Sequence, residues 1–187
     1  KGVGLSFFTE YGRYLGRLQG RQSSNILLRK AQYKKTEGNP CDVAQTFVAA
    51  KVVNSRSVLQ RHTRNHAASD AVNEAIHKLN QRLAHIRKSD DLERLRGFEG
   101  ESAAIYFSVF DELLMPSVRK DFSFNGRNRR PPKDPINALL SFCYSLLANE
   151  ISSAIQGAGL DPQAGFLHSD RPGRDSLSQD MLEEFRA

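Results

Sequence analysis

Apolar residues recur every three or four positions along most of the chain, which is the spacing of one face of an α-helix. From residue 26 onward this spacing predicts helices over residues 26–34, 40–62, 70–87, 89–114 and 134–157, and a last helix from residue 176. The expected buried faces are Val43, Phe47, Ala50 and Val58 in the second of these helices, and Val72, Ile76, Leu79, Leu83 and Ile86 in the third.

Two of the predicted helices carry a recognisable start. Asp134 stands directly before Pro135, and an acidic N-cap followed by proline at the first helical position is a strong start signal. Ser89 is expected to cap the helix that follows it, because its hydroxyl can accept a hydrogen bond from a free backbone N–H of the first turn.

The beginning of the chain reads differently. Leu5–Phe8 and residues 13–18 predict two short strands around a turn at residues 9–12. A lone hairpin is marginally stable in water, so we expect these to be the last strands of a small β domain that pairs with others. The predicted fold class is therefore mainly α. We expect residues 1–22 to be the remnant of an N-terminal β domain, and residues 23–187 to form a helical domain that is truncated at its C-terminus.

Composition narrows the class of protein. The 187 residues are 39% hydrophobic, and 27 Lys+Arg against 21 Asp+Glu give a net charge of +6, which favours a phosphate-rich partner. Cys41 and Cys143 stand far apart, which argues against a disulfide framework and suits a reducing compartment, so we expect a cytoplasmic protein. Cys143 lies in an apolar run and is expected in the core. The sequence contains no run of 18 apolar residues, so no membrane span is expected.

One glutamate falls on an apolar stripe. Steps of three and four through the helix at 89–114 pass through Leu92, Leu95, Glu99, Ala103, Tyr106, Phe110 and Leu113. A carboxylate on a core-facing stripe is costly unless it is paired or coordinates a cation, whereas Glu101 falls on another face. Gly97 and Gly100 flank Glu99 and would let a backbone or a ligand approach. The alternative is a Glu99 that pairs with a buried arginine or is wetted by a slight turn of the helix.

The end of the chain places a histidine before an acidic helix. His168 lies in the loop at residues 159–174, and the helix after it carries Asp180, Glu183 and Glu184. The expected buried line of that helix is Leu177, Met181 and Phe185, with the three acids on the opposite flank. Taken alone, such a helix is more often a solvated acidic face than a site. Periodicity does not decide which acid points at His168.

Together these segments suggest a divalent metal. Glu99, His168 and a carboxylate near residue 183 would supply two hard oxygens and one imidazole, which suit Mg²⁺ or Mn²⁺. The basic loops Arg127, Arg129, Arg130 and Lys133, with Arg171 and Arg174, could hold a DNA backbone. A metal beside a basic surface suggests phosphodiester chemistry. Each loop on its own is equally consistent with an ordinary solvated loop.

Three motifs carry a resemblance to a known family. LRGFEGESAAIYF, DPINALLSFCYSLL and GFLHSDRPGRDSLSQDMLEEFR resemble the CRISPR-associated spacer-acquisition integrase family, the universal adaptation nuclease, in order and spacing. Their style is most similar to versions from class 1 systems. The resemblance covers essentially the whole chain and implies a dimerising β domain before a helical catalytic domain.

The resemblance also implies residues and partners. Glu99, His168 and Glu183 match the metal-binding and catalytic positions, and Asp180 matches a second acid that is either a further ligand or a residue that positions one. The implied reaction inserts spacers into a CRISPR array by attack of a 3′-hydroxyl on a phosphodiester. The implied partners are double-stranded or branched DNA, a second copy of the chain and a small ferredoxin-like adaptation subunit. The alternatives are a non-catalytic helical DNA-binding scaffold and a helical protein-interaction domain.

Overall fold

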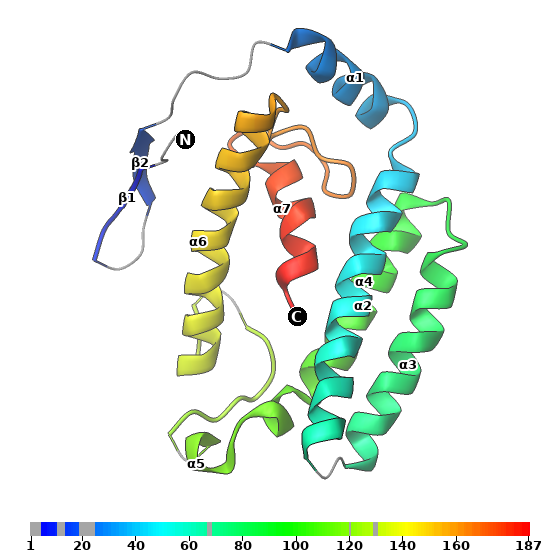
Figure 1. Ribbon diagram of the computed structural model, residues 1–187, viewed down its shortest axis with the longest axis vertical. Helices are drawn as coiled ribbons and strands as arrows, with labels where there is room; N and C mark the ends of the chain where they lie inside the picture. Colours follow the sequence, from blue (N-terminus) through cyan, green and yellow to red (C-terminus); the bar gives the residue numbers. More distant parts are fainter. Residues whose placement is uncertain (1–4, 11–13, 19–24, 67–68, 120, 129–130) are drawn as a thin grey trace. The chain divides into compact units, whose positions relative to one another are not determined.

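The computed structural model describes residues 5–10, 14–18, 25–66, 69–119, 121–128 and 131–187 (Figure 1). Helices dominate these residues, as predicted, and the described strands form a single hairpin. By internal contacts the chain divides into two compact units. Unit 1 comprises Lys1–Pro40 and Phe142–Leu182, and unit 2 comprises Cys41–Ser141 and Glu183–Ala187.

The hairpin confirms the two predicted strands. Strand β1 (Leu5–Phe8) pairs antiparallel with β2 (Tyr14–Leu18), with Leu5 opposite Leu18. Residues 11 and 12 of the predicted turn lie outside the described residues. So does the predicted domain boundary after residue 22, so the division of the chain into residues 1–22 and 23–187 stays a prediction.

Unit 1 also contains helix α1 (Ile26–Glu37), most of α6 (Pro135–Ala158) and α7 (Ser176–Leu182). Gln32 of α1 is buried, and its amide fixes the segment that follows α6. It donates to the carbonyl oxygens of Asp161 at 2.8 Å and Ala164 at 3.0 Å, and it accepts from the backbone N–H of Asp161 at 2.8 Å. The loop that carries His168 therefore begins from a backbone pinned to α1.

Unit 2 is built on three packed helices, α2 (Cys41–Asn65), α3 (Asp70–Ile86) and α4 (Leu92–Ser108). The short elements η1 (Phe110–Leu113) and α5 (Pro116–Arg119) follow α4, and η2 (Glu183–Phe185) packs on α2. Its aliphatic core includes the fully buried side chains Val48, Val52, Leu59, Val72, Leu79, Ile86 and Leu95. The predicted buried face of α3 is confirmed at all positions except Ile76, whose place Ala75 takes.

Two local predictions in unit 2 were wrong. The buried face of α2 is Ala44, Val48, Lys51, Val52, Ser55 and Leu59, one position on from the expected face, and Val58 is exposed. The N-cap of α4 is Asp91, whose carboxylate accepts from the backbone N–H of Arg94 at 2.8 Å. Ser89 stands too far ahead of the first turn to do this.

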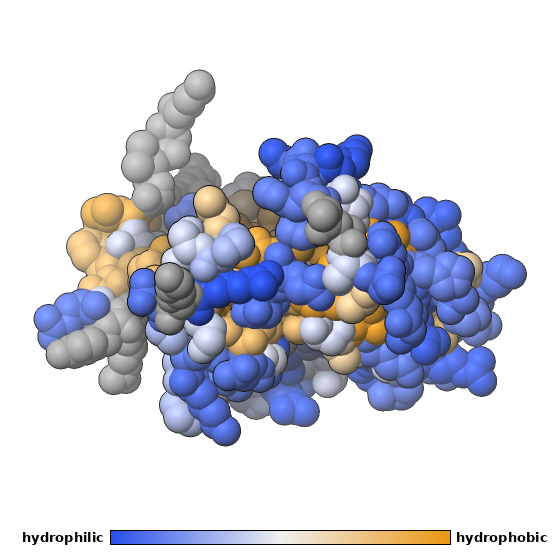
Figure 2. Space-filling model, turned by 90° about the horizontal axis from the view of Figure 1, so that it is seen from below, coloured by the Kyte–Doolittle hydropathy of each residue, from blue (hydrophilic) through white to orange (hydrophobic). Residues whose placement is uncertain are grey.

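Helix α6 begins as predicted, because Asp134 accepts from the backbone N–H of Asn137 at 2.8 Å and Pro135 is the first helical residue. Among the described residues it is the helix long and apolar enough to cross a membrane by length and composition, a test that core helices of soluble proteins also meet. The absence of a membrane span stays a prediction. Cys143 is exposed, so its expected place in the core was wrong. Figure 2 shows hydrophobic residues reaching the surface in patches on the face in view.

Candidate functional site

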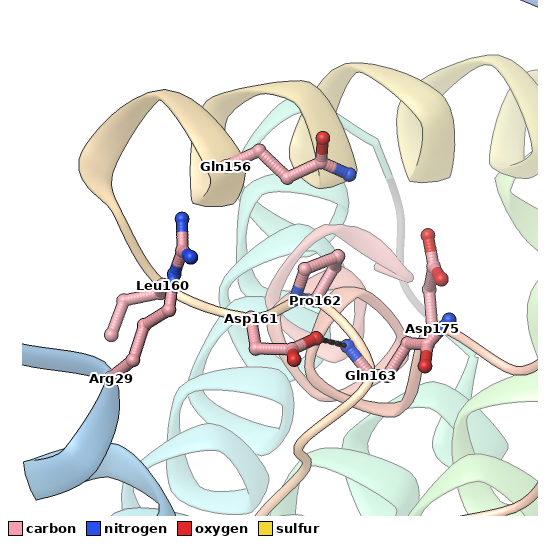
Figure 3. Close-up of a pocket in the computed structure, with 7 residues that line it drawn as sticks. All are labelled: Arg29, Gln156, Leu160, Asp161, Pro162, Gln163 and Asp175. Atoms are coloured by element: carbon pink, nitrogen blue, oxygen red, sulfur yellow. Dashed lines mark hydrogen bonds between the residues drawn. The ribbon is translucent and has the colours of Figure 1, made fainter. Parts of the chain in front are cut away.

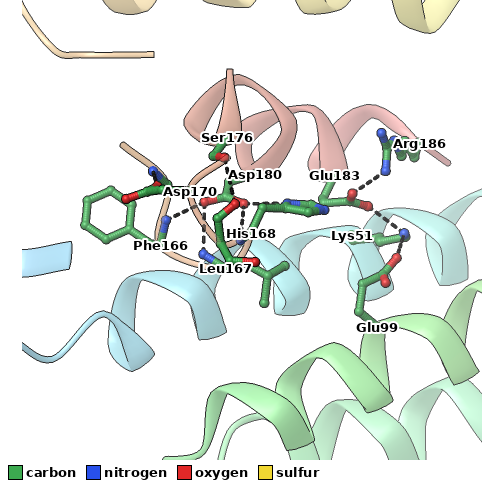
Figure 4. Close-up of polar contacts among 12 residues, drawn as sticks. Lys51, Glu99, Phe166, Leu167, His168, Asp170, Ser176, Asp180, Glu183 and Arg186 are labelled. Carbon is green, nitrogen blue, oxygen red and sulfur yellow. Dashed lines mark hydrogen bonds and ion pairs between the residues drawn. The ribbon is translucent and has the colours of Figure 1, made fainter. Parts of the chain in front are cut away.

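A buried lysine joins two of the predicted site residues in unit 2. The Nζ of Lys51 lies 2.6 Å from Oε2 of Glu183 and donates a second hydrogen bond to Oε1 of Glu99 (Figure 4). Lys51 comes from α2, Glu99 from α4 and Glu183 from η2. Three elements that are distant in the sequence therefore bring two carboxylates to one cation.

The helical stripe placed Glu99 correctly. Its side chain is 24% exposed and faces Lys51, whereas Glu101 is on another face and pairs with Arg82 at 2.9 Å. The alternative interpretation paired Glu99 with a buried arginine, and the structure pairs it with a buried lysine. A carboxylate that is partly shielded from water and bonded to an ammonium satisfies the requirement that buried charge be compensated.

The faces of the last helical segment were predicted correctly only at Leu177, which is buried. Asp180 and Glu183 are 0% and 1% exposed, whereas Phe185 is 54% exposed. The reason is that both acids have partners that outweigh an apolar contact. Glu183 bonds to Lys51 and to Arg186, and the adjacent backbone is tied to α2 by Asn54, whose Nδ2 donates to the carbonyl oxygen of Glu184 at 2.7 Å.

Asp180 organises the histidine loop of unit 1. Its carboxylate accepts from the backbone N–H groups of Phe166 at 2.6 Å, Leu167 at 2.9 Å and His168 at 2.9 Å (Figure 4). It also bonds to Nδ1 of His168 at 2.6 Å. An ionised carboxylate can only accept, so with Asp180 ionised the hydrogen of this bond is on Nδ1, and in a neutral imidazole Nε2 then carries the lone pair. Asp180 is therefore the acid that points at His168, and it fixes the ring with Nε2 left for a ligand or a proton.

Gly165 allows this loop to close. A Cβ at this position would lie 2.7 Å from the Cβ of Ser176, 2.8 Å from the carbonyl oxygen of His168 and 3.1 Å from Oδ2 of Asp180. Gly97 and Gly100 differ, because an added Cβ would meet nothing within 4 Å. Close approach of another part of the chain therefore explains Gly165 and does not explain the two glycines beside Glu99.

The donor set fits a divalent cation in part. The carboxylates of Glu99 and Glu183 converge on an ammonium, which stands where positive charge is favoured. The third predicted ligand, His168, belongs to unit 1, so the structure describes the predicted ligands as two clusters. Among the described residues no group of three or more His, Cys, Asp or Glu side chains is arranged to hold a metal ion. The three-ligand centre stays a prediction.

The predicted DNA-binding residues fall into different environments. Arg127 is committed to its own loop, where it donates to the carbonyl oxygen of Asn128 and to Oδ1 of Asn137. Lys133 and Arg171 are exposed, and Arg174 is half-buried. Arg129 and Arg130 lie outside the described residues. Lys133 and Arg171 thus present side chains that a phosphate backbone could reach, and Arg127 shapes the loop before α6.

The main cavities of unit 1 lie elsewhere than the predicted ligands. One, of about 380 Å³, is lined by Arg29, Gln156, Leu160, Asp161, Pro162, Gln163 and Asp175 (Figure 3). A second, of about 360 Å³, includes Arg171, Asp170 and Tyr33 in its wall. There the hydroxyl of Tyr33 donates to Asp161 at 2.6 Å, and this hydrogen bond, with burial and the charge of Asp161, raises the pKa of Tyr33. His168 and Asp180 line neither cavity.

Sequence reasoning missed Lys51 and Arg186. Both cations are buried against Glu183, and long cationic side chains are ordinarily assigned to the surface. A usable signal for Lys51 was present, because it falls in the series Ala44, Val48, Val52, Leu59 at helical spacing. A lysine within an apolar stripe, like a glutamate in the same position, indicates a buried ion pair.

The chain matches the family described as CRISPR associated protein Cas1 over residues 1–187. It is 46% identical to a CRISPR-associated endonuclease Cas1 of Chlorobaculum tepidum, over all of this chain and 55% of that protein. It is 47% identical to one of Leptospira interrogans, over 86% of this chain and 65% of that protein. This mainly helical chain, with its paired acids and its histidine loop, therefore belongs to the Cas1 family. The chain spans about half the length of the curated relatives it matches.

Solved structures share the fold. A casposase bound to an integration product is 28% identical with a TM-score of 0.77, over 98% of this chain and 50% of that one. A Cas1 protein from Thermotoga maritima is 27% identical with a TM-score of 0.76, over 98% of this chain and 56% of that one. The predicted family and the predicted helical fold are both confirmed.

Proposed function

We propose that this chain is part of a divalent-metal-dependent DNA endonuclease and integrase that inserts new spacers into CRISPR arrays. The observation that carries the proposal is the convergence of Glu99 and Glu183, from α4 and η2, on a single cation. Membership of the Cas1 family supports the nuclease class, and the integration product bound to the similar casposase supports strand transfer.

In this proposal Glu99, Glu183 and Nε2 of His168 hold Mg²⁺ or Mn²⁺. When bound, such an ion polarises the phosphodiester and stabilises the charge that develops during attack by a 3′-hydroxyl. Asp180 keeps the imidazole of His168 in one tautomer and one orientation through the bond to Nδ1. Lys133, Arg171 and Arg174 contact the DNA backbone, and Arg127 holds the loop before α6 in shape.

The proposed partners are DNA, a second copy of the protein and a small ferredoxin-like adaptation subunit, as the family resemblance implies. We also propose a cytoplasmic location, because the two cysteines stand far apart in the sequence and do not indicate a disulfide framework. These assignments concern the whole protein, and they follow from family membership rather than from a contact in the chain.

The test measures cleavage and strand transfer on branched DNA with Mn²⁺. Glu99→Ala is expected to lower the rate by about 10³-fold, the scale of losing a group that stabilises transition-state charge. Glu101→Ala is the matched control, because Glu101 lies two residues away on α4 and its exposed carboxylate pairs with Arg82. It should keep the rate within about twofold. Equal rates for Glu99→Ala and wild type would refute the assignment.

The competing function is a non-catalytic DNA-binding scaffold. The observation in its favour is that Lys51 already pairs with both acids, as in a purely structural ion-pair network. A scaffold binds DNA with a steep salt dependence and shows no turnover in wild type or in Glu99→Ala. Salt-insensitive binding, or none, would instead favour a protein-interaction domain.

A further inference from the structure

Lys51 is a charged residue on the buried face of α2. Its side chain is 4% exposed, and its neighbours on that face are Ala44, Val48, Val52, Ser55 and Leu59. Moving an ammonium group from water into a core is unfavourable unless the group is paired and hydrogen-bonded. Lys51 meets this condition through Glu99 and Glu183 together, so its position depends on both acids.

The space that Nζ occupies is the space a metal ion would need. A divalent ion binds carboxylate oxygens at about 2.0–2.2 Å, and the ammonium already lies 2.6 Å from Oε2 of Glu183. An ion that bridged Glu99 and Glu183 would lie between the two carboxylates, where Nζ lies now, and at that separation the two cations would overlap and repel each other. Metal binding and the Lys51 contacts are therefore competing states of the same two carboxylates.

We propose that Lys51 is a resident counter-cation, which holds Glu99 and Glu183 in their converging orientation in the metal-free protein and is displaced when a divalent ion binds. The inference rests on the proposed function, because it takes the same carboxylates as ligands. Lys51 is then a positioning residue that sets how tightly the metal is held. It keeps the acids gathered when no metal is present and weakens the affinity for metal by competition.

Arg186 does not replace Lys51 in this role. Arg186 bonds to Oε1 of Glu183. The hydrogen bond that the structure describes for Glu99 comes from Lys51. Without Lys51, the Glu99 carboxylate loses its ammonium partner while Glu183 keeps a guanidinium. The two carboxylates would then repel each other in the metal-free protein, and a divalent ion would relieve that repulsion without having to displace an ammonium.

The experiment is titration of the metal-free protein with MnCl₂, followed by calorimetry and by thermal unfolding. Lys51→Met removes the charge and keeps most of the aliphatic stem. We expect it to unfold at a lower temperature without metal, to bind Mn²⁺ about tenfold more tightly than wild type, and to gain more thermal stability from Mn²⁺. Lys78→Met is the control, since Lys78 forms an exposed pair with Glu74 at 2.8 Å. Its affinity for Mn²⁺ should equal that of wild type.

The outcomes separate the two proposals. Tighter binding by Lys51→Met supports the counter-cation, even where wild type binds too weakly to measure. Equal or weaker binding by Lys51→Met, with measurable binding by wild type, overturns the counter-cation and leaves the metal-dependent function standing. No Mn²⁺ binding by either protein overturns both. A Lys51 that is only a structural partner predicts a destabilised variant that Mn²⁺ does not rescue.

A second measurement covers a variant that fails to fold. Wild type is treated with an amine-acylating reagent with and without MnCl₂, and labelling at each lysine is read by mass spectrometry. Buried Lys51 is expected to be protected without metal and to be labelled several-fold more with it, while labelling of exposed Lys78 does not change. Equal protection of Lys51 in both conditions overturns the proposal.

Discussion

Asp180 and Glu183 are three positions apart in the sequence, and both are closed off from water, but the groups that hold them differ in kind. Asp180 accepts from three backbone N–H groups and from the ring of His168. Glu183 is held by two cationic side chains, Lys51 and Arg186. The first acid is held by backbone N–H groups and a ring nitrogen, and the second by two charged side chains.

The difference suggests two roles: Asp180 holds the histidine loop in place, whereas Glu183 can bind a cation other than Lys51. Backbone N–H groups cannot rotate away, so the oxygens of Asp180 are not free to ligate a metal without breaking the loop. A lysine can leave by rotating its side chain, so Glu183 can exchange one cation for another. We therefore propose that Asp180, the acid whose role the sequence left open, positions His168.

The largest expected effect tests this distinction on Asp180. In Asp180→Asn one carboxylate oxygen becomes an NH₂ group that faces backbone donors, and buried donors without an acceptor each cost about 1–3 kcal/mol. We expect the free energy of unfolding to fall by about 3 kcal/mol, measured by urea unfolding. Addition of Mn²⁺ should not restore it.

Glu183→Gln is the matched comparison. Its amide oxygen can still accept from Lys51, which also keeps Glu99, and the new NH₂ group then faces one donor, the guanidinium of Arg186. We therefore expect a smaller loss, of about 2 kcal/mol. The stabilisation by Mn²⁺ should disappear, because a neutral amide is a weak ligand. If Glu183→Gln proved the less stable variant and still responded to Mn²⁺, the two acids would have exchanged roles and the comparison would be wrong.

The sequence was enough to predict the helices, the hairpin and the position of Glu99. Glu99 was found because the stripe of α4 is long and interrupted by a single charge. The burial of Asp180 and Glu183 was not, because Leu177, Met181 and Phe185 give an equally good helical line. Apolar spacing ranks faces by side-chain hydrophobicity alone. It is blind to backbone donors and cations supplied by residues far away in the sequence.

The same limit explains Lys51. The face chosen for α2 contained Val43, Phe47, Ala50 and Val58, and the true face lies one residue on. Aliphatic residues occur on both faces, so the side with a lysine was assigned to water. The acids of α4 and η2, which lie at least 48 residues away in sequence, pair with Lys51 and so allow that side to be buried.

The next expected effect concerns the loop that Asp180 holds. In Gly165→Ala the new methyl group would lie within 3 Å of Ser176 and of the carbonyl oxygen of His168, so the backbone must shift. We expect a loss of about 2 kcal/mol in unfolding free energy, in the range of overpacking a buried site. The shift should also lengthen the bonds to Asp180, detectable as faster amide hydrogen exchange at Leu167 and His168.

Gly97→Ala is the control for that variant. Gly97 lies inside α4 with nothing within 4 Å of an added Cβ, so alanine should stabilise the helix by about 0.5–1 kcal/mol. Opposite signs for the two glycines would show that Gly165 is required by the crowding around Asp180. A stabilising Gly165→Ala would mean that the loop is loose and that Asp180 does not hold it rigidly.

The smallest expected effect concerns Asp134, a half-buried acid that accepts hydrogen bonds from amide side chains and the backbone. Burial acts to raise its pKa, and the opposing hydrogen bonds from Asn137, Asn128 and the backbone outweigh it and hold the pKa below its usual value. A carboxyl with a depressed folded-state pKa contributes stability above its unfolded pKa, about 3.9, and loses it as pH falls through the folded pKa. Asp134→Asn should therefore be less stable than wild type at neutral pH, by under about 1 kcal/mol. The difference should close toward about pH 3.

Salt distinguishes neutral donors from charges as the cause. The pKa of exposed Glu74 is lowered by its hydrogen bond to Lys78 and by the charge of that lysine. In about 1 M NaCl the Debye length falls to about 3 Å and exposed ion pairs are weakened, so the pKa of Glu74 should move part of the way back toward its usual value while that of Asp134 stays low. Carboxyl titration by NMR at low and high salt measures both. If the pKa of Asp134 rose with salt as far as that of Glu74, the surrounding arginines and lysines would be its cause. Fixed amide donors would then not be what sets the behaviour of acids such as Asp134 and Asp180.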